Sequence, residues 1–369
     1  MSQATFHPLA IASLTPETAD AITVAFRVGE DLTETFKYRA GQYLTLKFII
    51  NGKEERRAYS MCSAPQDAEL AVTVKRVKGG IVSNHIADFL RPGDTVEVMP
   101  PQGRFMVAPD HKARRDYYLF GAGSGITPLM SILRNILEEE PKSRVFLLYG
   151  NRDEDSIIFE KQLEDLVSRY AGQLEVEHTL SRPKKYKVGG LKGFFSGGER
   201  KWTGAVGRVG IKAVQAFMDR HPGSVADKQY FVCGPGQMID DVEQALLGLG
   251  VHKELIHTER FVSANAVKKA APVAGKVQDA KVIATLGGKE VEVTLKPGQT
   301  ILDGLLESGA APPYSCLAGA CSTCMAKVSK GGVKMEVCFA IDDDEIAQGY
   351  ILACQSHPTT EEVHVTFDV

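Results

Sequence analysis

Residues 313–324 read PYSCLAGACSTC, and residues 349–358 read GYILACQSHP. Together they place four cysteines at a fixed spacing: Cys316, Cys321, Cys324 and, after 29 intervening residues, Cys354. A [2Fe–2S] cluster needs four thiolates, two on each iron, and three closely spaced cysteines with a distant fourth are typical of it. A zinc site would be expected to have two compact Cys-x2-Cys pairs, and only Cys321 and Cys324 form one. The spacing therefore predicts an iron–sulfur cluster, with zinc as the alternative.

The residues around these cysteines add detail. Gly319 lies inside the loop, where a tight fold around sulfur favours a positive φ, and backbone N–H groups there can bond the cluster sulfurs. Cys338 falls outside the spacing and is expected to be a packed free thiol. Over roughly the last 90 residues the chain resembles plant-type ferredoxins. The resemblance implies a β-grasp [2Fe–2S] domain whose four cysteines bind the iron pair and whose cluster carries one electron.

The composition limits the class of protein. The chain has 369 residues, which predicts two or three domains of roughly 100–200 residues each. Hydrophobic residues make up 44% and charged residues 24%, which is too apolar for a disordered chain. The net charge of −3 disfavours nucleic acid as a partner. We find no run of roughly 18 apolar residues and no basic head followed by an apolar block, so we expect a cytoplasmic protein without membrane attachment.

The charge is unevenly distributed. Residues 281–369 contain 12 acidic and 6 basic residues, a net charge of −6, so residues 1–280 carry +3. A basic body joined to an acidic module indicates two parts that attract each other. Random scatter of surface charge is the alternative.

Two sequence patterns precede the cysteine-rich module. Residues 1 to about 108 contain strand-like runs separated by turns such as Asn51-Gly52, which predicts an antiparallel β-barrel. From Asp116 onward strands alternate with helices, which predicts a doubly wound parallel α/β sheet. Residues 263–279 are small and polar, and we interpret them as a linker, with a short helix as the alternative. The predicted domains are 1–112, 113–262 and 280–369, with 263–279 between the last two.

Four short motifs in the first two domains are suited to nucleotide binding. Arg57-Ala58-Tyr59-Ser60 combines a guanidinium for phosphate, an aromatic ring and a hydroxyl. In GGIVS, residues 79–83, Ser83 is expected to cap a helix whose N-terminus faces an anion. GAGSGITP (121–128) and CGPG (233–236) each follow a predicted strand and open a helix, where glycine lets the backbone approach a pyrophosphate. Each motif alone is weak evidence, because ordinary strands and capped helices contain the same residues.

In this order the four motifs resemble the ferredoxin–NADP reductase superfamily, over about residues 5–262. The resemblance implies an FAD-binding barrel joined to a nicotinamide-nucleotide domain. It implies that Arg57 holds the flavin phosphates, Tyr59 packs on the flavin ring and Ser60 bonds near flavin N5. It also implies that Cys233 lies beside the nicotinamide and that Glu259 completes the catalytic group. The remaining implied cofactor contacts are Gly80, Ser83, Gly121, Gly123, Gly125, Thr127, Pro128, Gly234, Pro235 and Phe261.

The implied electron donor is NADPH, with NADH as the alternative. Ser181 and Arg182 follow a predicted strand, and members that prefer NADPH hold its 2′-phosphate with such a pair; Arg152 is a second candidate. Residues 183–208 are rich in Gly and Lys and are expected to form a long surface loop. FMN is the alternative to FAD, and Gly80 and Ser83, placed to hold a second phosphate, favour FAD.

The order of the modules implies electron flow from NADPH through FAD and the [2Fe–2S] cluster to an oxygenase. Residues 250–261 and 334–358 most resemble the reductase components of phenylacetyl-CoA epoxidase systems. That resemblance implies a partner with a non-haem di-iron centre that acts on an aromatic acyl-CoA. A Rieske-type or other multicomponent oxygenase is the alternative partner. A redox-sensing protein is an alternative of another class, and the set of hydride-site residues argues against it.

Overall fold

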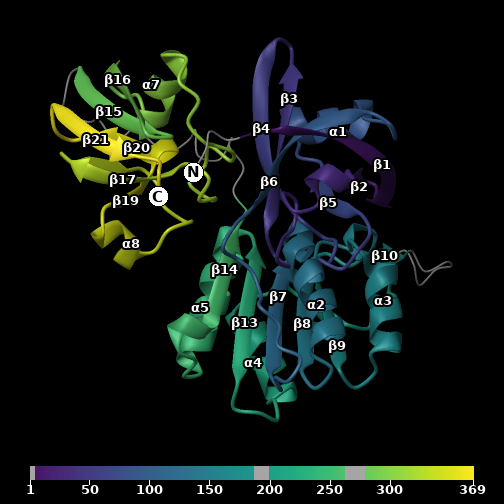
Figure 1. Ribbon diagram of the computed structural model, residues 1–369. Helices are drawn as coiled ribbons and strands as arrows, with labels where there is room; N and C mark the ends of the chain where they lie inside the picture. The colour runs from purple at the N-terminus through teal and green to yellow at the C-terminus, as the bar shows by residue number, and fades with distance from the viewer. Residues whose placement is uncertain (1–4, 187–198, 262–278) are drawn as a thin grey trace.

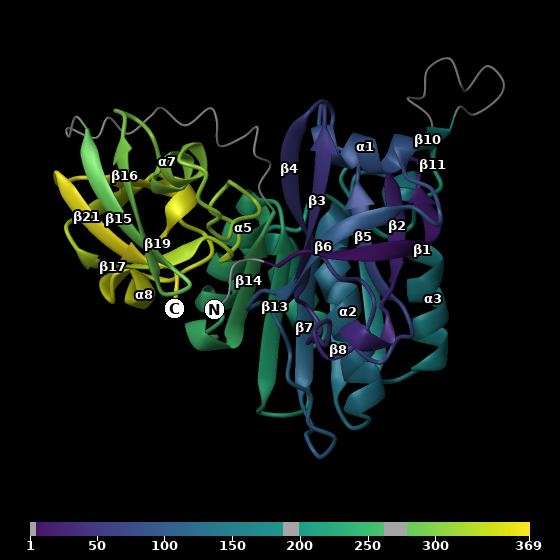
Figure 2. The same cartoon turned by 45° about the horizontal axis from the view of Figure 1, so that its top comes forward.

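The computed structural model describes residues 5–186, 199–261 and 279–369. Three main sheets divide these residues into three units (Figure 1). The second unit lies below the first in Figure 1, and the third lies to one side of both. A second view places the third unit beside strands β3 and β4 of the first unit and beside β14 and α5 of the second (Figure 2). The predicted linker falls, except for Asp279, outside the described residues.

The first unit is an antiparallel barrel. Its sheet runs in the order β4-β3-β6-β1-β2-β5, and a bridge between Met61 and Val72 joins the two outer strands. Alternating residues such as Val24 and Phe26 of β2 are buried in its core, because successive strand side chains point to opposite faces. Its elements are β1 (His7–Thr18), β2 (Ala21–Arg27), η1 (Glu30–Leu32), β3 (Tyr43–Ile50), β4 (Lys53–Ser60), β5 (Leu70–Lys75), α1 (Ile81–Phe89) and β6 (Thr95–Gln102).

The second unit is a parallel sheet covered by helices on both faces. The strand order is β12-β9-β8-β7-β13-β14, so the order reverses between β7 and β13, and ligands bind at such a switch point. The residues of α2 and α3 are buried in one core, and those of α4 and α5 in another. Its main elements are β7 (Asp116–Ala122), α2 (Ile126–Glu139), β8 (Arg144–Asn151), α3 (Glu160–Arg169), β9 (Leu174–Leu180), α4 (Ile211–Arg220), β13 (Lys228–Gly234), α5 (Gly236–Gly248) and β14 (Ile256–Arg260). Short helical turns lie at η2 (Gly123–Gly125), η3 (Glu154–Ser156) and η5 (Lys253–Leu255).

The stretch 183–208 is not a loop throughout, contrary to the expectation from its composition. Two of its residues form β12 (Ala205–Val206), which pairs in parallel with the end of β9 and extends the sheet. Two more pairs form a small ladder between β10 (Lys185–Tyr186) and β11 (Glu199–Arg200). The unpaired edge of β9 explains the added strand, because an edge offers free backbone groups to a neighbouring segment.

The third unit is a five-stranded sheet that wraps around one helix, the β-grasp arrangement. Its strand order is β16-β15-β21-β17-β19, with β15 and β21 parallel and the other pairs antiparallel. Ile301, Leu302 and Leu305 of α7 are buried against the sheet. Its elements are β15 (Ala280–Leu286), β16 (Lys289–Leu295), α7 (Ile301–Glu307), β17 (Met325–Lys330), β18 (Val333–Met335), α8 (Asp343–Ala347), β19 (Tyr350–Leu352), η6 (Ala353–Gln355), β20 (Ser356–Pro358) and β21 (Glu362–Thr366).

The helices are those of a globular core. In the part of the chain that the structure describes, none combines the length and the apolar character that crossing a bilayer requires. Even α2, with its buried face, has 14 residues, whereas a membrane span takes about 20.

Packing leaves little room for a side chain at one position inside α7. A Cβ atom on Gly304 would come within 1.9 Å of Leu295 Cδ2 on β16. In a free helix alanine is favoured over glycine by about 1 kcal/mol, but an added methyl group in a packed core costs about 1–3 kcal/mol. We therefore expect Gly304→Ala to lower the free energy of unfolding of this unit by up to about 2 kcal/mol, measured by calorimetry.

Gly248 provides the matched control. It is the last residue of α5, and a Cβ atom there would meet nothing within 4 Å. Gly248→Ala should leave the unfolding temperature unchanged or raise it. Equal stability of the two variants would contradict the packing argument.

Candidate cofactor site

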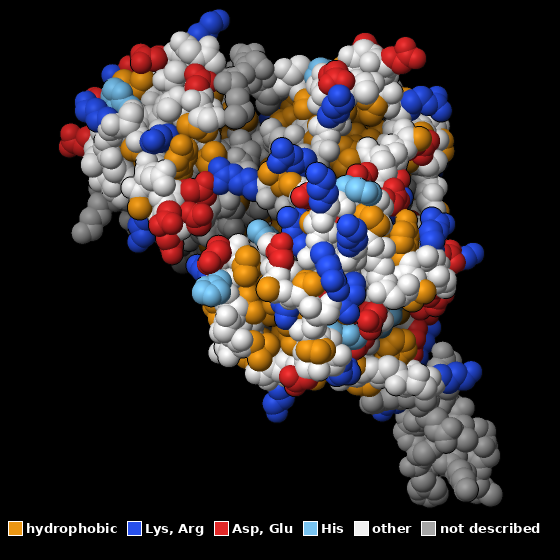
Figure 3. Space-filling model, turned by 60° about the horizontal axis from the view of Figure 1, so that its bottom comes forward, with side chains coloured by type: hydrophobic (Ala, Val, Ile, Leu, Met, Phe, Trp, Pro, Cys, Tyr) orange, Lys and Arg blue, Asp and Glu red, His pale blue; other side chains and the backbone are white. Residues whose placement is uncertain are grey.

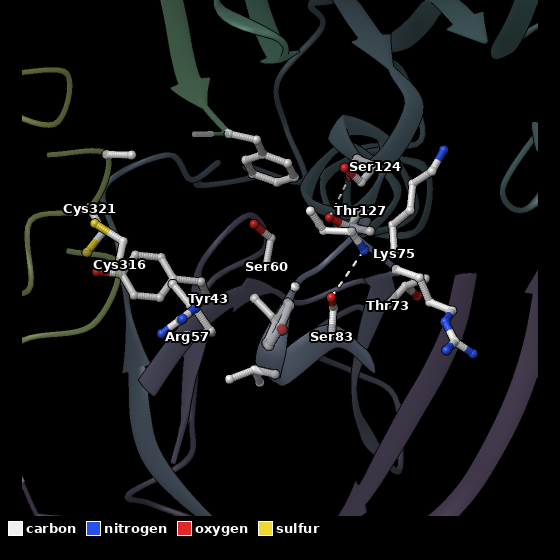
Figure 4. Close-up of a pocket in the computed structure, with 18 of the residues that line it drawn as sticks. Tyr43, Arg57, Ser60, Thr73, Lys75, Ser83, Ser124, Thr127, Cys316 and Cys321 are labelled. Atoms are coloured by element: carbon white, nitrogen blue, oxygen red, sulfur yellow. Dashed lines mark hydrogen bonds between the residues drawn. The ribbon is translucent and has the colours of Figure 1, made fainter. Parts of the chain in front are cut away.

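A cavity of about 570 Å³ lies where the three units meet. In Figure 4 Cys316 and Cys321 lie at one end beside Tyr43, Ser60 lies near the middle, and Lys75 and Ser83 lie toward the other end. This volume falls within the roughly 300–1,000 Å³ that is usual for small-molecule sites. Ten of the predicted site residues line it: Arg57, Tyr59, Ser60, Gly80, Ser83, Thr127, Glu259, Phe261, Cys316 and Cys321.

The barrel side of the cavity comes from the end of β4. This strand pairs with β3 along its length and places Ser60 opposite Tyr43, so the side chains from Arg57 to Ser60 have a fixed register. Arg57 Nη2 lies 3.0 Å from Glu55 Oε2, and Lys75 lines the cavity from the neighbouring β5. Lys75 Nζ lies 3.8 Å from Asp20 Oδ2, so phosphate oxygens bound here would share both cations with carboxylates.

Ser60 and Glu259 meet across the cavity although 199 residues separate them. The Ser60 hydroxyl donates to Glu259 Oε2 at 3.0 Å. Burial raises the pKa of Glu259 to about 8, against the opposing effect of this hydrogen bond. The Glu259 carboxyl is therefore mainly protonated at pH 7, and the cavity holds a neutral acid next to a hydroxyl.

The start of α1 corrects one prediction. Gly80, with φ −72° and ψ 129°, is the N-cap, and Ser83 lies inside the first turn instead. The Ser83 hydroxyl accepts a hydrogen bond from the Val77 N–H at 3.1 Å, drawn as a dashed line in Figure 4. A Cβ atom on Gly80 would come within 3.0 Å of Val77 Cβ, so the close turn favours glycine as the cap. Residues 79–83 line the cavity, where the first amides of a helix suit a phosphate.

The glycine loop after β7 lies against the end of β13. A Cβ atom on Gly125 would come within 2.1 Å of the Cys233 carbonyl oxygen, so only glycine allows this approach. Gly123 has a φ of 54°, and a Cβ atom there would meet only Lys75 Nζ, at 3.9 Å. The loop therefore leaves open space above the first turn of α2, as a nucleotide phosphate requires.

The other predicted residues of these loops lie at the same sheet edge but outside the cavity wall. Gly121 is the last residue but one of β7, and Pro128 is buried in the first turn of α2. Cys233 and Gly234 are the last two residues of β13, and Pro235 is the N-cap of α5. Cys233 is fully buried, and burial raises the pKa of its thiol well above the usual range. Its thiol is therefore protonated at neutral pH.

The residues predicted to hold the nucleotide 2′-phosphate lie at the ends of β8 and β9. The Arg182 N–H donates to the Arg152 carbonyl oxygen at 2.7 Å, which brings the two arginines together. Ser181 precedes Arg182 at the end of β9. The Arg152 side chain is 61% exposed and pairs with Asp153, so a phosphate there would share the guanidinium with a carboxylate.

The four predicted cluster cysteines form one group of thiols. Their contacts run from Cys321 to Cys316, from Cys316 to Cys354 and from Cys354 to Cys324. Among the described residues no three His, Cys, Asp or Glu side chains are placed to hold one metal ion. Two irons that each take two thiolates need no such convergence, so the four sulfurs fit a [2Fe–2S] cluster.

The loop backbone also fits a cluster. Gly319 has a φ of 66°, and a Cβ atom there would come within 2.9 Å of the Val337 carbonyl oxygen. The Ala318 N–H lies 3.4 Å from Cys316 Sγ, in hydrogen-bonding geometry. Contact with Cys316 and burial both raise the pKa of the Cys321 thiol. Bound iron would offset this effect, because a metal binds the thiolate form of cysteine. Cys338 lies apart, with its Sγ 3.5 Å from the Ile341 carbonyl oxygen.

The residues that join the cysteine loop to the barrel were not predicted from the sequence. Tyr43 and Gln102 both hydrogen-bond Thr323, and Thr45 bonds Ser315. Each pair is separated by more than 200 residues. Hydroxyl and amide side chains of this kind belong to no motif, so the sequence contains no local signal for them.

Comparisons with known proteins agree with this architecture. Three family models match successive parts of the chain: an oxidoreductase FAD-binding domain over residues 9–107, an oxidoreductase NAD-binding domain over 119–244 and a 2Fe-2S iron-sulfur cluster binding domain over 284–359. These matches confirm FAD, NAD(P)H and a [2Fe–2S] cluster as the cofactors.

Relatives span the whole chain. One of the proteins that make up the 1,2-phenylacetyl-CoA epoxidase of Escherichia coli K12 is 37% identical over 366 residues, covering 99% of this chain and 98% of the relative. A 3-ketosteroid-9-alpha-monooxygenase ferredoxin reductase component of Rhodococcus rhodochrous is 35% identical over 368 residues, covering 97% and 96%. The solved structure of phthalate dioxygenase reductase shares the fold, with a TM-score of 0.60 at 23% identity and 98% coverage of each chain.

The matched domains, their order and the full-length relatives agree with the cavity that the three units share. The protein is an NAD(P)H-dependent oxidoreductase that transfers electrons through a flavin and an iron–sulfur cluster. The chain belongs to the ferredoxin–NADP reductase superfamily, in the family of oxygenase reductase components that end in a plant-type [2Fe–2S] domain.

Proposed function

We propose that this chain delivers electrons from NADPH to a di-iron oxygenase that acts on an aromatic acyl-CoA, with phenylacetyl-CoA as the first candidate. The observation that carries the electron route is the common cavity, which Arg57 and Ser60 of the barrel share with Cys316 of the cysteine loop. The choice of partner is supported by the 37% identity to the Escherichia coli relative from the 1,2-phenylacetyl-CoA epoxidase.

The side chains of the cavity bind and position the cofactors in this proposal. When bound, FAD accepts a hydride from NAD(P)H and releases electrons one at a time to the cluster. Arg57 and Lys75 neutralise phosphate charge, and the first turn of α1 adds backbone N–H groups. Ser60 and the protonated Glu259 supply hydrogen bonds near the reacting ring. Phe261 lines the cavity and packs partly on the core of the second unit, so it excludes water from that wall.

The remaining assignments are parts of the same proposal. NADPH is the preferred donor, since the cations Arg152 and Arg182 and the Ser181 hydroxyl follow β8 and β9. Cys233 acts beside the nicotinamide, and the loop Gly121–Pro128 holds the dinucleotide together with Gly234 and Pro235. The domain boundaries are those expected from the sequence: 1–112, 113–262 and 280–369, with 263–279 as the linker.

A second partner class has specific support. The ketosteroid monooxygenase reductase component from Rhodococcus is 35% identical over nearly the whole chain, almost as similar as the epoxidase relative. A partner of the ketosteroid monooxygenase type, or a Rieske-type oxygenase, is therefore the second candidate. A redox-sensing role is disfavoured, because the Ser60–Glu259 pair and the open glycine loop are features that a hydride-transfer site needs.

The partner can be tested by reconstitution. The holoprotein and NADPH are mixed with a purified phenylacetyl-CoA epoxidase oxygenase component and phenylacetyl-CoA, and in parallel with a ketosteroid monooxygenase oxygenase component and its steroid. We expect epoxide to form about tenfold faster than hydroxylated steroid, since a specific docking surface discriminates by about 1.4 kcal/mol or more. Ferricyanide reduction at equal rates in both mixtures is the control.

The outcomes separate the candidates. Product with the steroid oxygenase alone would overturn the first partner and favour the second. No reduction of ferricyanide, with flavin and cluster both bound, would favour the redox sensor.

The cluster assignment predicts different effects for two cysteines. Cys354→Ser should lose most of its iron and its [2Fe–2S] absorbance, because one iron loses a thiolate ligand. NADPH should still bleach its flavin at a rate within about twofold of the parent. Cys338→Ser is the matched control and should keep its iron. Iron analysis and visible spectroscopy measure both effects, and full iron content in Cys354→Ser would refute the assignment.

The raised pKa of Glu259 predicts a pH dependence. The carboxyl is neutral below pH 8 and ionises as the pH rises through about 8. A hydride brings negative charge into the cavity, which an ionised Glu259 repels, so flavin reduction by NADPH should slow above that pH. Glu259→Gln stays neutral and keeps a hydrogen-bond partner for Ser60, so its profile should be flat. Anaerobic stopped-flow absorbance measures the rates.

Glu254→Gln is the control for this pH profile, since Glu254 is an exposed acid close in the chain. Its profile should match the parent. If Glu259→Gln also keeps the parent profile, the ionisation belongs to another group.

A further inference from the structure

The third unit contacts the barrel on both sides of its cysteine loop. Ser315, which precedes the first cluster cysteine, accepts a hydrogen bond from Thr45 Oγ1 at 3.0 Å. Thr323, which precedes Cys324, lies 2.8 Å from the Tyr43 hydroxyl and donates to Gln102 Oε1 at 3.0 Å. Strands β3 and β6 thus hold both ends of the loop.

Arg56 lies at the centre of a further contact between the units. Its guanidinium carbon is 3.9 Å from the centroid of the Tyr314 ring and 4.9 Å from that of Phe6. Its Nη2 lies 2.7 Å from Glu54 Oε1, and the Tyr314 hydroxyl donates to the same oxygen at 3.1 Å. One carboxylate therefore binds the barrel cation and the tyrosine of the third unit together.

The burial of Arg56 depends on the third unit. Only 12% of its side chain is exposed, and its Nη1 is buried without a hydrogen-bond partner among the described residues. A buried cation is unfavourable unless it is paired and stacked, and a planar guanidinium stacks well on aromatic rings. Tyr314 supplies the closer ring, so this arrangement exists only while the third unit lies on the barrel.

We propose that Arg56 is a positioning residue that docks the iron–sulfur module on the barrel and so holds the cysteine loop at the cavity. The inference rests on the electron route proposed above. Arg57, the next residue of β4, lines the cavity whereas Arg56 contacts Tyr314, because neighbouring strand residues point to opposite faces. Strand β4 thus contributes Arg57 to the cavity and Arg56 to the contact with Tyr314. Cys316, the first cluster cysteine, follows Tyr314 by two residues, so this contact also positions the cysteine loop.

The rim of the same contact has an ion pair. Arg104, just after β6, pairs with Glu345 of α8. In Figure 3 acidic side chains gather on the iron–sulfur module beside its boundary, and basic side chains lie across that boundary. Because the Arg104 side chain is 50% exposed, this pair adds less to the alignment than the buried Arg56 contact.

The test compares Arg56→Gln with Lys47→Gln in the holoprotein. Lys47 is the matched control, because its ammonium lies over the Phe6 ring and pairs with Glu97 of the barrel. Two readouts are used: hydrogen–deuterium exchange of residues 314–323 without NADPH, and stopped-flow absorbance of flavin and cluster after NADPH is added. We expect exchange about fivefold faster in Arg56→Gln, cluster reduction about tenfold slower and flavin reduction within about twofold of the parent. Lys47→Gln should match the parent in the exchange rate, the cluster reduction rate and the flavin reduction rate.

Variants of Tyr314 test the contact from the other side and guard against misfolding of Arg56→Gln. Tyr314→Leu removes the ring and should show the same faster exchange and slower cluster reduction as Arg56→Gln. Tyr314→Phe keeps the aromatic ring over Arg56, so its rates should be close to those of the parent. Arg56→Lys keeps the charge without the planar group and should recover less than half of the lost rate.

Unchanged exchange or unchanged cluster reduction in Arg56→Gln would overturn the proposal. Equal slowing of flavin and cluster reduction would overturn it too, since that result indicates damage to the cavity. If NADPH does not reduce the cluster of the parent protein, the proposed electron route is wrong. The hydrogen–deuterium exchange of Arg56→Gln would still test the docking contact.

Discussion

The hydrogen bond between Tyr43 of the barrel and Thr323 of the cysteine loop joins the two halves of the electron route. Tyr43 lines the cavity and lies opposite Ser60 in the β3–β4 register, while Thr323 lies between two cluster cysteines. Burial raises the pKa of Tyr43 well above its usual range, so its hydroxyl keeps the proton that this bond uses. Electrons pass efficiently only between centres that lie close together, and no single unit of this chain holds both centres. This short polar contact at the barrel edge is therefore one of the contacts that keep the cysteine loop at the shared cavity.

The sequence alone predicted the features whose cause is local. The cysteine spacing determines which thiols can meet, and the four sulfurs form one chain of contacts. Gly319 has the positive φ expected of a loop folded around sulfur. Alternating strands and helices require a parallel sheet, and the reversal between β7 and β13 brings the two glycine-containing loops together. In each case the conformation depends on residues close together in the chain, so a short sequence motif can predict it.

The rest could not be predicted because it depends on pairs that are distant in the chain. Arg56 with Tyr314 and Thr45 with Ser315 are common residue types with no motif, and only the folded barrel and β-grasp sheet bring them together. The predicted N-cap of α1 was wrong for a related reason. The turn that begins at Val77 places Gly80 as the N-cap of the helix, so Ser83 lies inside the helix. The two residues of β12 are too few to show a period of two, so their pairing with β9 has no sequence signal.

The charge difference between the modules contributes less to docking than the sequence suggested. Arg104 and Glu345 form an ion pair at the rim, but the contacts around the cysteine loop are hydrogen bonds between neutral side chains and a stacked guanidinium. Attraction between charges extends over a Debye length of about 8–10 Å, whereas a neutral hydrogen bond is lost once its atoms separate by about an ångström. Contacts of this kind fix the position of the cysteine loop closely. They attract the module only weakly once it has left the barrel. Long-range attraction to the barrel would oppose any release of the module, whereas contacts of this kind act only at short range.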